Sequence, residues 1–348
     1  MSNVFRSVMI FAIAISLLAI VAFLGACSNG ETGTAAPAAV RLGYFPNVTH
    51  APAILGVTEG YFQEELGDVS LQTATFNAGT EATEALFSGA IDMTFIGPNP
   101  AINAFAQSGG EAVRIVSGTT SGGAALVVRE GVDTPADLAS TRLATPSLGN
   151  TQDVALRAWL ADQGYATTLE GGGDVSILPQ SNAQTLETFR SGDIDGAWVP
   201  EPWATRLVLE GGGHVLVNEA DLWPEGQFVT THLIVATSFL DEHPDQVRAV
   251  LRGLIRAVDF ANQDPFQAQA AVNANIEQLT GKALAPDVIS GSWNNLTFTL
   301  DPIASSLQRS ADDAIEVGLL EPVDLKGIYA LDILNEVLRE EGRPEVSQ

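Results

Sequence analysis

Residues 149–153, Gly-Asn-Thr-Gln-Asp, lie between a short apolar run and a helical stretch. A helix that begins here leaves backbone N–H groups unpaired in its first turn, and such helix ends bind anions. Asn150, Thr151 and Gln152 would add neutral side-chain groups at the same place. The segment therefore predicts an oxyanion site, although simple capping of the helix by Asn150 or Thr151 also explains these residue types.

A second polar loop, Pro-Asn-Val-Thr-His at residues 46–50, follows the first apolar run of the chain. It is the equivalent of residues 149–153, so we expect Asn47, Thr49 and His50 to face the same cleft. His50 follows a predicted strand rather than lying on an apolar stripe. Both a ligand contact and a plain loop role fit this histidine.

Other candidates lie at the ends of predicted strands or the starts of predicted helices, where each also fits an ordinary role as a cap, turn or loop residue. Residues 97–100, Gly-Pro-Asn-Pro, are expected to form a rigid turn that presents an asparagine to a ligand. Residues 121–123, Ser-Gly-Gly, precede an expected hinge, where glycine permits bending and close approach. The candidates of this group are Thr80, Asn99, Ser121, Gly122 and Thr231.

The segment Trp-Val-Pro-Glu-Pro-Trp at residues 198–203 places two tryptophans around a carboxylate that prolines flank on both sides. Proline fixes the backbone on both sides of Glu201, which exceeds what the end of a strand requires. We expect Trp198 in the core and Glu201 or Trp203 in the cleft.

Motifs for catalysis are absent from the sequence. It has no Gly-x-Gly-x-x-Gly after the first strand, no Walker A sequence and no nucleophile elbow. The histidines at 50, 214, 232 and 243 are too dispersed for a metal-ligand signature. The sequence therefore predicts no catalytic residue, no metal and no cofactor.

The elements that would carry these residues occur twice. Residues 67–97 and 173–200 both begin Gly-Asp-Val-Ser, pass through Asn-Ala and reach Ser-Gly-x-Ile-Asp. Upstream, Arg41-Leu42 corresponds to Arg142-Leu143, and a Gly-Tyr pair follows each. Several matches in the same order indicate two duplicated lobes.

Each copy predicts strand, helix, strand, helix, strand, which gives a parallel sheet. Ligands bind beyond the carboxyl ends of such strands, so two facing lobes would form one cleft. The expected strands are 40–45, 69–76 and 93–96, then 142–145, 175–178 and 196–199; the expected helices are 51–59, 80–88, 153–162 and 183–190. Residues 123–129 and 228–237 are expected to cross between lobes, and 243–348 to be helical and packed on the first lobe. The lobes are thus predicted at 40–122 plus 230–348 and at 123–229.

The N-terminus has the pattern of an export signal. One charge, Arg6, precedes an apolar stretch at residues 10–24, which ends in Leu-Gly-Ala-Cys. This ending resembles the lipobox of bacterial lipoproteins, which implies a signal peptide at 1–26 and a lipid on Cys27. Small and polar residues then predict a flexible tether at 27–39. An uncleaved anchor helix is the alternative, but the apolar run is short for a membrane span.

Acidic residues outnumber basic ones by 42 to 16, for a formal charge of −26. This charge disfavours nucleic acid and anionic lipid head groups as partners. Screening limits the field to roughly 8 Å at physiological salt, so local donors can still hold a small anion. Hydrophobic residues make up 46% of the chain, enough for a large core, and the single cysteine excludes an internal disulfide.

The strand leading into Gly-Tyr-Phe-Pro at 43–46, the paired Ser-Gly-x-Ile-Asp segments, Asp-Leu after Thr134-Pro135 and the 198–203 segment resemble the nitrate/sulfonate/taurine class of transporter-associated binding proteins. The resemblance covers roughly residues 40–320. It implies an α/β type II periplasmic-binding-protein fold and an ABC permease and ATPase as partners. The export signal predicts action outside the cytoplasm, and we expect a monomer. The resemblance leaves open aliphatic sulfonates, taurine, nitrate, bicarbonate, and pyrimidine or flavin precursors as ligands.

A cationic anchor would be expected in nitrate-type members, yet the two lysines, Lys282 and Lys326, lie in the C-terminal part, away from the cleft loops. Neutral donors suit a sulfonate, and Glu81 or Glu201 could pair with an amine, which favours aliphatic sulfonates or taurine. A pyrimidine-precursor biosynthetic enzyme of the same fold is an alternative, but it would need a cofactor-binding lysine. A purely structural surface lipoprotein would have no need of duplicated lobes with facing polar loops.

Overall fold

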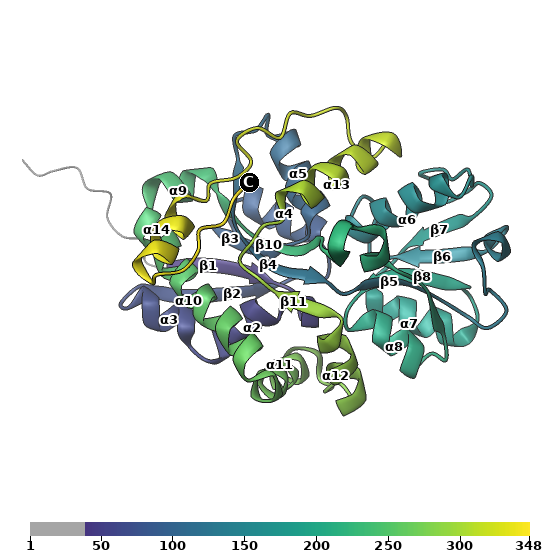
Figure 1. The fold of residues 1–348 in the computed structure, drawn as a ribbon, viewed down its shortest axis with the longest axis horizontal. Helices are drawn as coiled ribbons and strands as arrows, with labels where there is room; N and C mark the ends of the chain where they lie inside the picture. The colour runs from purple at the N-terminus through teal and green to yellow at the C-terminus, as the bar shows by residue number, and fades with distance from the viewer. Residues whose placement is uncertain (1–38) are drawn as a thin grey trace, which may run out of the picture. The chain divides into compact units, whose positions relative to one another are not determined.

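A computed structural model describes residues 39–348, which form a mixed α/β structure built on two separate sheets (Figure 1). The predicted signal peptide, Cys27 and the tether up to residue 38 lie outside the described residues. Within 39–348, no helix combines the length and the apolar composition needed to cross a membrane.

The first sheet has six strands, and we call this sheet with the helices packed on it the first lobe. β1 pairs in parallel with β2 and β3, whereas β10 is antiparallel to β3 and β4, and β11 is antiparallel to β4. The spatial order is β11 (Leu296–Phe298), β4 (Val113–Gly122), β10 (Val229–Ala236), β3 (Met93–Ile96), β1 (Ala39–Tyr44) and β2 (Ser70–Thr75).

The second sheet, with its helices, forms the second lobe and repeats this arrangement. β6 pairs in parallel with β7 and β8, and β5 is antiparallel to β8 and β9. The order is β7 (Ser176–Pro179), β6 (Arg142–Thr145), β8 (Gly196–Pro200), β5 (Ala124–Val128) and β9 (His214–Asn218). The two parallel units predicted from the repeat are therefore present, one in each sheet.

The repeated Arg-Leu and Ile-Asp pairs tie the first strand of each unit to the third. Asp92 accepts a hydrogen bond from the Arg41 backbone N–H at 2.8 Å, and its own N–H donates to the Arg41 carbonyl at 2.8 Å. Asp195 makes the same two bonds with Arg142, at 2.8 and 2.7 Å. Each guanidinium also lies within ion-pairing distance of its aspartate. These residues are structural, and they lie at the start of the strands.

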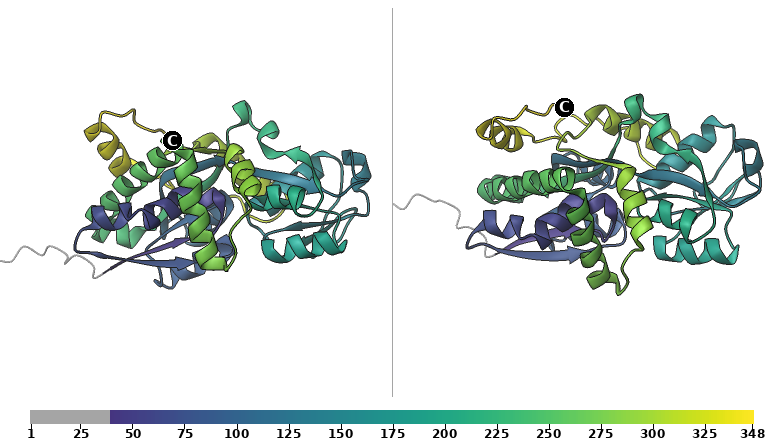
Figure 2. Two further views of the ribbon diagram at one scale, coloured as in Figure 1. Left: turned by 90° about the horizontal axis from the view of Figure 1, so that it is seen from below. Right: turned by 60° about the horizontal axis from the view of Figure 1, so that its bottom comes forward.

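Helices cover both faces of each sheet (Figures 1 and 2). The predicted helices of the repeat are found within two residues of their expected ends. In the first lobe they are α2 (Ala51–Thr58) and α4 (Gly79–Phe87), and in the second α6 (Thr151–Asp162) and α7 (Asn182–Ser191). Three further helices were not predicted, namely α3 (Tyr61–Leu66), α5 (Pro98–Gln107) and α8 (Trp203–Leu209). Single 3-10 turns are η1 (Val48–His50), η2 (Pro135–Leu138), η3 (Glu219–Leu222) and η4 (Pro224–Gly226).

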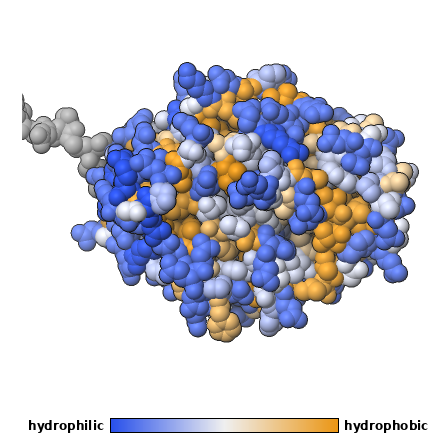
Figure 3. All heavy atoms as spheres, in the orientation of Figure 1, coloured by the Kyte–Doolittle hydropathy of each residue, from blue (hydrophilic) through white to orange (hydrophobic). Residues whose placement is uncertain are grey.

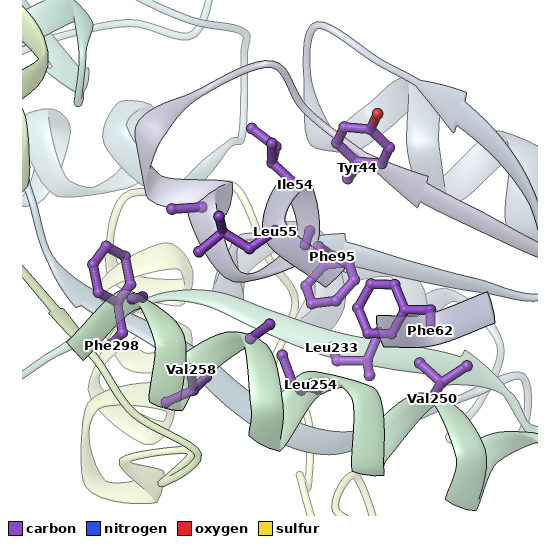
Figure 4. Packing of buried hydrophobic residues seen from close by; sticks show 14 of the residues in the cluster. Tyr44, Ile54, Leu55, Phe62, Phe95, Leu233, Val250, Leu254, Val258 and Phe298 are labelled. Carbon is purple, nitrogen blue, oxygen red and sulfur yellow. The ribbon is translucent and has the colours of Figure 1, made fainter. Parts of the chain in front are cut away.

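The C-terminal part is mainly helical and packs on the first lobe, as predicted. Val250, Leu254 and Val258 of α10 belong to the same buried cluster as Phe62 and Leu233 (Figure 4). Burying each such side chain stabilises the fold by about 1.5–3 kcal/mol. The helices are α9 (Thr237–Glu242), α10 (Pro244–Gln263), α11 (Pro265–Thr280), α12 (Pro286–Asn294), α13 (Ala304–Glu316) and α14 (Asp332–Glu340).

Two expectations about local structure need correction. Residues 97–100 are not an isolated rigid turn, because α5 begins at Pro98 and proline is compatible with the first turn of a helix. The expected crossings contain strands: residues 123–129 hold β5 of the second sheet, and 228–237 hold β10 of the first. The chain changes sheet at Gly122 and Gly123, whose φ angles of 82° and 74° favour glycine.

Glu219 is a buried carboxyl group in the second lobe. Its Oε2 accepts a hydrogen bond of 2.6 Å from Trp198 Nε1, and only 2% of the residue is exposed. Burial raises the pKa of Glu219 to about 7, although the bond from Trp198 acts in the opposite direction.

The face of the molecule drawn in Figure 1 is largely hydrophilic, with apolar patches between charged and polar residues (Figure 3).

We expect Glu219→Gln to stabilise the protein at high pH. Between pH 4.5 and 7 the folded protein holds a proton on Glu219 that the unfolded chain has lost, so this group's contribution to stability falls as pH rises through that window. Glutamine keeps the acceptor for Trp198 without the charge. Urea unfolding should show a gain of about 1–3 kcal/mol at pH 8 and almost none at pH 4.5. The exposed Glu225→Gln is the control, and a gain equal at both pH values would contradict the assignment.

Candidate functional site

Two adjoining cavities lie between the lobes, and they share Asn47, Asn77 and Asn182 in their linings. The smaller one, which we call the inner chamber, has a volume of about 40 Å³. This is room for roughly three water-sized groups, the size of a compact head group. Its polar lining comes from the first lobe through Asn47, Thr49, His50, Asn77 and Thr230, and from the second lobe through Asn150, Thr151, Gln152 and Asn182.

The inner chamber thus brings together six residues predicted from sequence, namely Asn47, Thr49, His50, Asn150, Thr151 and Gln152. Trp203 lies on the wall of the larger cavity. Both walls contribute, as expected for loops that follow the strands of two facing parallel sheets.

Helix N-termini supply the electrostatics of the inner chamber. α4, α6 and α7 begin at Gly79, Thr151 and Asn182, and all three of these residues line it. Each helix end carries a partial positive charge near +0.5 and unpaired N–H groups. The only ionisable residue in the lining is His50. The chamber is therefore a neutral site that favours an anion.

The start of α6 contains a helix cap and also leaves hydrogen-bond donors unpaired. Asn150 Oδ1 accepts from the Asp153 N–H at 3.0 Å, which is a helix cap, and the Gly149 N–H donates to Asp153 Oδ2 at 2.9 Å. These two amides are therefore not free. The N–H groups of Thr151 and Gln152, in the first turn, and the Thr151 hydroxyl stay available to a ligand. Beneath them Asp153 pairs with Arg157 at 3.0 Å, and both side chains are fully buried.

His50 is held as a neutral hydrogen-bond donor. Its Nδ1 accepts from the Phe45 N–H at 3.4 Å, and its ring stacks on Phe45 with centroids 4.4 Å apart. Complete burial lowers the pKa of His50 to about 3, so the ring is uncharged at neutral pH. With Nδ1 as acceptor, the proton resides on Nε2, which has no hydrogen-bond partner in the described part of the chain.

Glu201 or Trp203 was expected in the cleft. Trp203 lines the larger cavity, but the structure places the Glu201 carboxylate outside both cavities. Oε1 accepts from Thr205 Oγ1 at 2.9 Å and from Asn295 Nδ2 at 2.7 Å, while Oε2 accepts from Ser292 Oγ at 3.0 Å and from the Thr205 N–H at 3.1 Å. This buried carboxylate therefore ties the start of α8 to the end of α12. Its acceptor capacity is used within the protein.

The remaining candidates also lie outside the chamber linings. Asn99 donates to the Ser310 carbonyl on α13, and Thr80 is exposed to solvent. Ser121 Oγ accepts from the Phe228 N–H, and the Gly122 carbonyl accepts from the Thr230 hydroxyl. Thr231 donates to the Thr49 carbonyl at 3.1 Å, so it positions a chamber residue without lining the chamber.

Sequence reasoning missed Asn77 and Asn182 as chamber residues. They are the equivalent asparagines of the two Asn-Ala pairs in the repeat, so the duplication itself carried the signal. Asn182 Oδ1 is buried and has no hydrogen-bond partner among residues 39–348. A buried polar atom without a partner in a cavity wall is accounted for when a ligand or water fills the cavity.

The larger cavity, which we call the outer chamber, has a volume of about 290 Å³. Its apolar wall is formed by Phe76, Trp203, Ile276 and Leu284. Trp203 Nε1 of the second lobe donates a hydrogen bond of 3.0 Å to Asn47 Oδ1 of the first. The ionisable residues of its lining are Arg206, Glu210 and Lys282. The expectation that both lysines lie away from the cleft was therefore wrong for Lys282. This residue comes shortly after the end of α11 and lines the outer chamber.

Groups of three or more histidine, cysteine or acidic residues able to hold a metal ion are absent from the described residues. The fold and the chamber between the sheets define the class, a two-lobed α/β protein with a polar chamber between its lobes.

Residues 33–275 match the NMT1-like family, and the chain belongs to it. It is similar to the taurine-binding periplasmic protein of Escherichia coli (strain K12), with 26% identity over 69% of this chain and 74% of that protein. Among solved structures, it resembles the alkanesulfonate-binding protein SsuA from Xanthomonas axonopodis pv. citri bound to MOPS, with a TM-score of 0.68, 22% identity, and coverage of 83% of this chain and 96% of that one. It also resembles the nitrate-binding protein NrtA from Synechocystis PCC 6803, with a TM-score of 0.72, 16% identity, and coverage of 87% and 89%.

Because His50 is neutral, we expect binding of a sulfonate to be independent of pH between 5 and 8. A site that required a protonated histidine would lose about tenfold in affinity per pH unit above the histidine pKa. Calorimetry with methanesulfonate, which stays ionised throughout, measures this directly. His50→Gln should weaken binding at every pH, whereas the same change at His214, which is half-buried and outside both chambers, should not. A steep loss above pH 6.5 would show that His50 binds as a cation.

Proposed function

We propose that this protein is the extracytoplasmic solute-binding component of an ABC importer and that it binds a small organic anion, such as an aliphatic sulfonate or taurine. The observation that carries this proposal is the inner chamber, where three helix N-termini and neutral side-chain groups meet without a charged residue. We take residues 40–122 plus 230–348 and residues 123–229 as the two lobes, which close around the ligand.

The chemistry of the inner chamber suits a sulfonate head group. A sulfonate offers three oxygens that accept hydrogen bonds, and each bond to a charged group contributes about 1.5–3 kcal/mol. Donors on both walls include the Thr151 hydroxyl and the His50 Nε2–H. The relatives named for taurine and alkanesulfonates support this ligand class.

The outer chamber favours an organic anion over nitrate or bicarbonate. Those two ions would occupy the inner chamber and leave about 290 Å³ beside it unfilled. A carbon chain attached to the head group would extend along the apolar wall of Trp203 and Phe76 and bury apolar surface. A planar pyrimidine or flavin precursor stacked on Trp203 is the second candidate, since the same indole lines the chamber.

We propose binding rather than catalysis, because the lining of the inner chamber has no nucleophile paired with a base, and burial lowers the pKa of its one histidine to about 3, which makes it a weak base. The relative named a periplasmic protein supports a location outside the cytoplasm. The lipobox-like ending at Cys27 supports a lipid anchor, and the partners would be a membrane permease and its ATPase. The formal charge of −26 disfavours nucleic acid as a partner. We also propose that the protein acts as a monomer.

We expect Thr151→Val to weaken sulfonate binding by about tenfold, because valine keeps the shape and removes one donor to a charged group. Calorimetry with an alkanesulfonate measures the effect. Thr80→Val is the matched control, since this exposed threonine lies outside both chambers and should leave the dissociation constant unchanged. If Thr151→Val leaves the dissociation constant unchanged and a neutral heterocycle binds tightly, the oxyanion site is contradicted. The proposed carrier function would not be affected by that result.

We expect Cys27→Ser to release the protein from membranes or to leave its precursor uncleaved, because serine lacks the thiol that accepts the lipid. Membrane fractionation and the apparent mass of the processed chain give the readout. Ser28→Ala, one residue further on, should change neither. If Cys27→Ser fractionates and is processed like the wild type, Cys27 is not the site of the anchor.

A further inference from the structure

Lys282 is one of the few cations in the described part of the chain that lack an ion pair, although its charge acts on the Glu210 carboxylate from beyond 4.0 Å. Most arginines of residues 39–348 lie within 4.0 Å of an aspartate or glutamate, whereas Lys282 forms no ion pair within that described part. Lys326 and Arg114 also lack an ion pair there, but neither lines the outer chamber, whereas Lys282 does and would be within reach of a ligand.

Glu210, the one acidic residue of the outer chamber, is already occupied. Arg206 Nε and Nη2 donate to its two carboxylate oxygens at 3.0 and 3.1 Å. The Arg206 guanidinium also lies over the Trp203 ring, 4.5 Å from its centroid. Arg206 therefore takes one acceptor site on each oxygen of Glu210 and balances its charge.

The formal charge of the outer chamber is then +1, from Arg206 and Lys282 against Glu210, while its remaining lining is uncharged. A ligand whose head group fills the inner chamber would place its far end here. An anionic far end would gain from the free ammonium of Lys282, and a cationic far end would meet net positive charge.

We propose that the outer chamber makes the protein selective for organic sulfonates whose far end carries a second anionic group, such as a carboxylate, and that it discriminates against those with an ammonium group at that end. This inference rests on the proposed function, and it specifies the ligand class for the same site. Within that class it places sulfocarboxylates ahead of simple alkanesulfonates, and both ahead of taurine.

The test compares ligands that differ only at the far end. Calorimetry would use sulfonates with spacers of two to four methylene groups that end in methyl, ammonium or carboxylate, with methanesulfonate as the reference without a tail. We expect the carboxylate series to bind about tenfold tighter than the ammonium series, with the methyl series between them. The difference should shrink in 1 M salt, where the screening length falls to about 3 Å.

Lys282→Gln tests the residue itself. We expect it to reduce the difference between carboxylate and ammonium tails to about threefold or less, and to leave the affinity for methanesulfonate unchanged. Lys326→Gln is the matched control, because the second lysine lines a separate surface pocket. Equal binding of the three tails, tightest binding of the ammonium series, or an unchanged preference in Lys282→Gln would overturn this inference alone. Failure of every sulfonate, methanesulfonate included, would overturn the proposed function and this inference with it.

Discussion

The direction of a helix that follows a parallel strand places the donors of the inner chamber. The chain leaves such a strand at its carboxyl end, so the helix begins there with its first N–H groups unpaired. Because α4 and the pair α6 and α7 do this on opposite lobes, their N-termini meet. The aspartates of the Ile-Asp pairs fix the other end of the strands. They bind Arg41 and Arg142 where the strands begin, so these charges stay away from the chamber.

Much of the fold could be predicted because the repeat consists of local patterns. Apolar runs of four to six residues specify β1, β3, β6 and β8, and each helix of the repeat begins within two residues of its expected start. The antiparallel strands carry less local information. β5 and β10 appeared only as expected crossings, since their place in a sheet depends on partners far away along the chain. The prolines of residues 98–100 indicated a turn, but proline at a helix start fits the same sequence.

Chamber residues could be predicted where they lie a few residues after the end of a strand, as Asn47, His50 and Thr151 do. The site could not be predicted where the outcome depends on which distant segment covers a residue. Glu201 was expected to face a ligand, but Ser292 and Asn295, which lie 91 and 94 residues further on, take up its oxygens. Lys282 reaches the outer chamber only because α11 packs on α2 and returns the chain to the cleft.

Whether a strongly acidic protein can hold the proposed anion depends on which charges are near enough to act. Beyond roughly 8 Å the surface carboxylates are screened, so the ionised groups around the chambers decide. Asp153 lies directly beneath the start of α6, yet Arg157, the Thr145 hydroxyl and the Gly149 N–H all bind it. An aspartate left unpaired there would repel an anion bound at Thr151. The charge of Asp153 is instead balanced by Arg157, and its contacts orient the first turn of α6. The helix N-terminus therefore retains its attraction for a negative ligand.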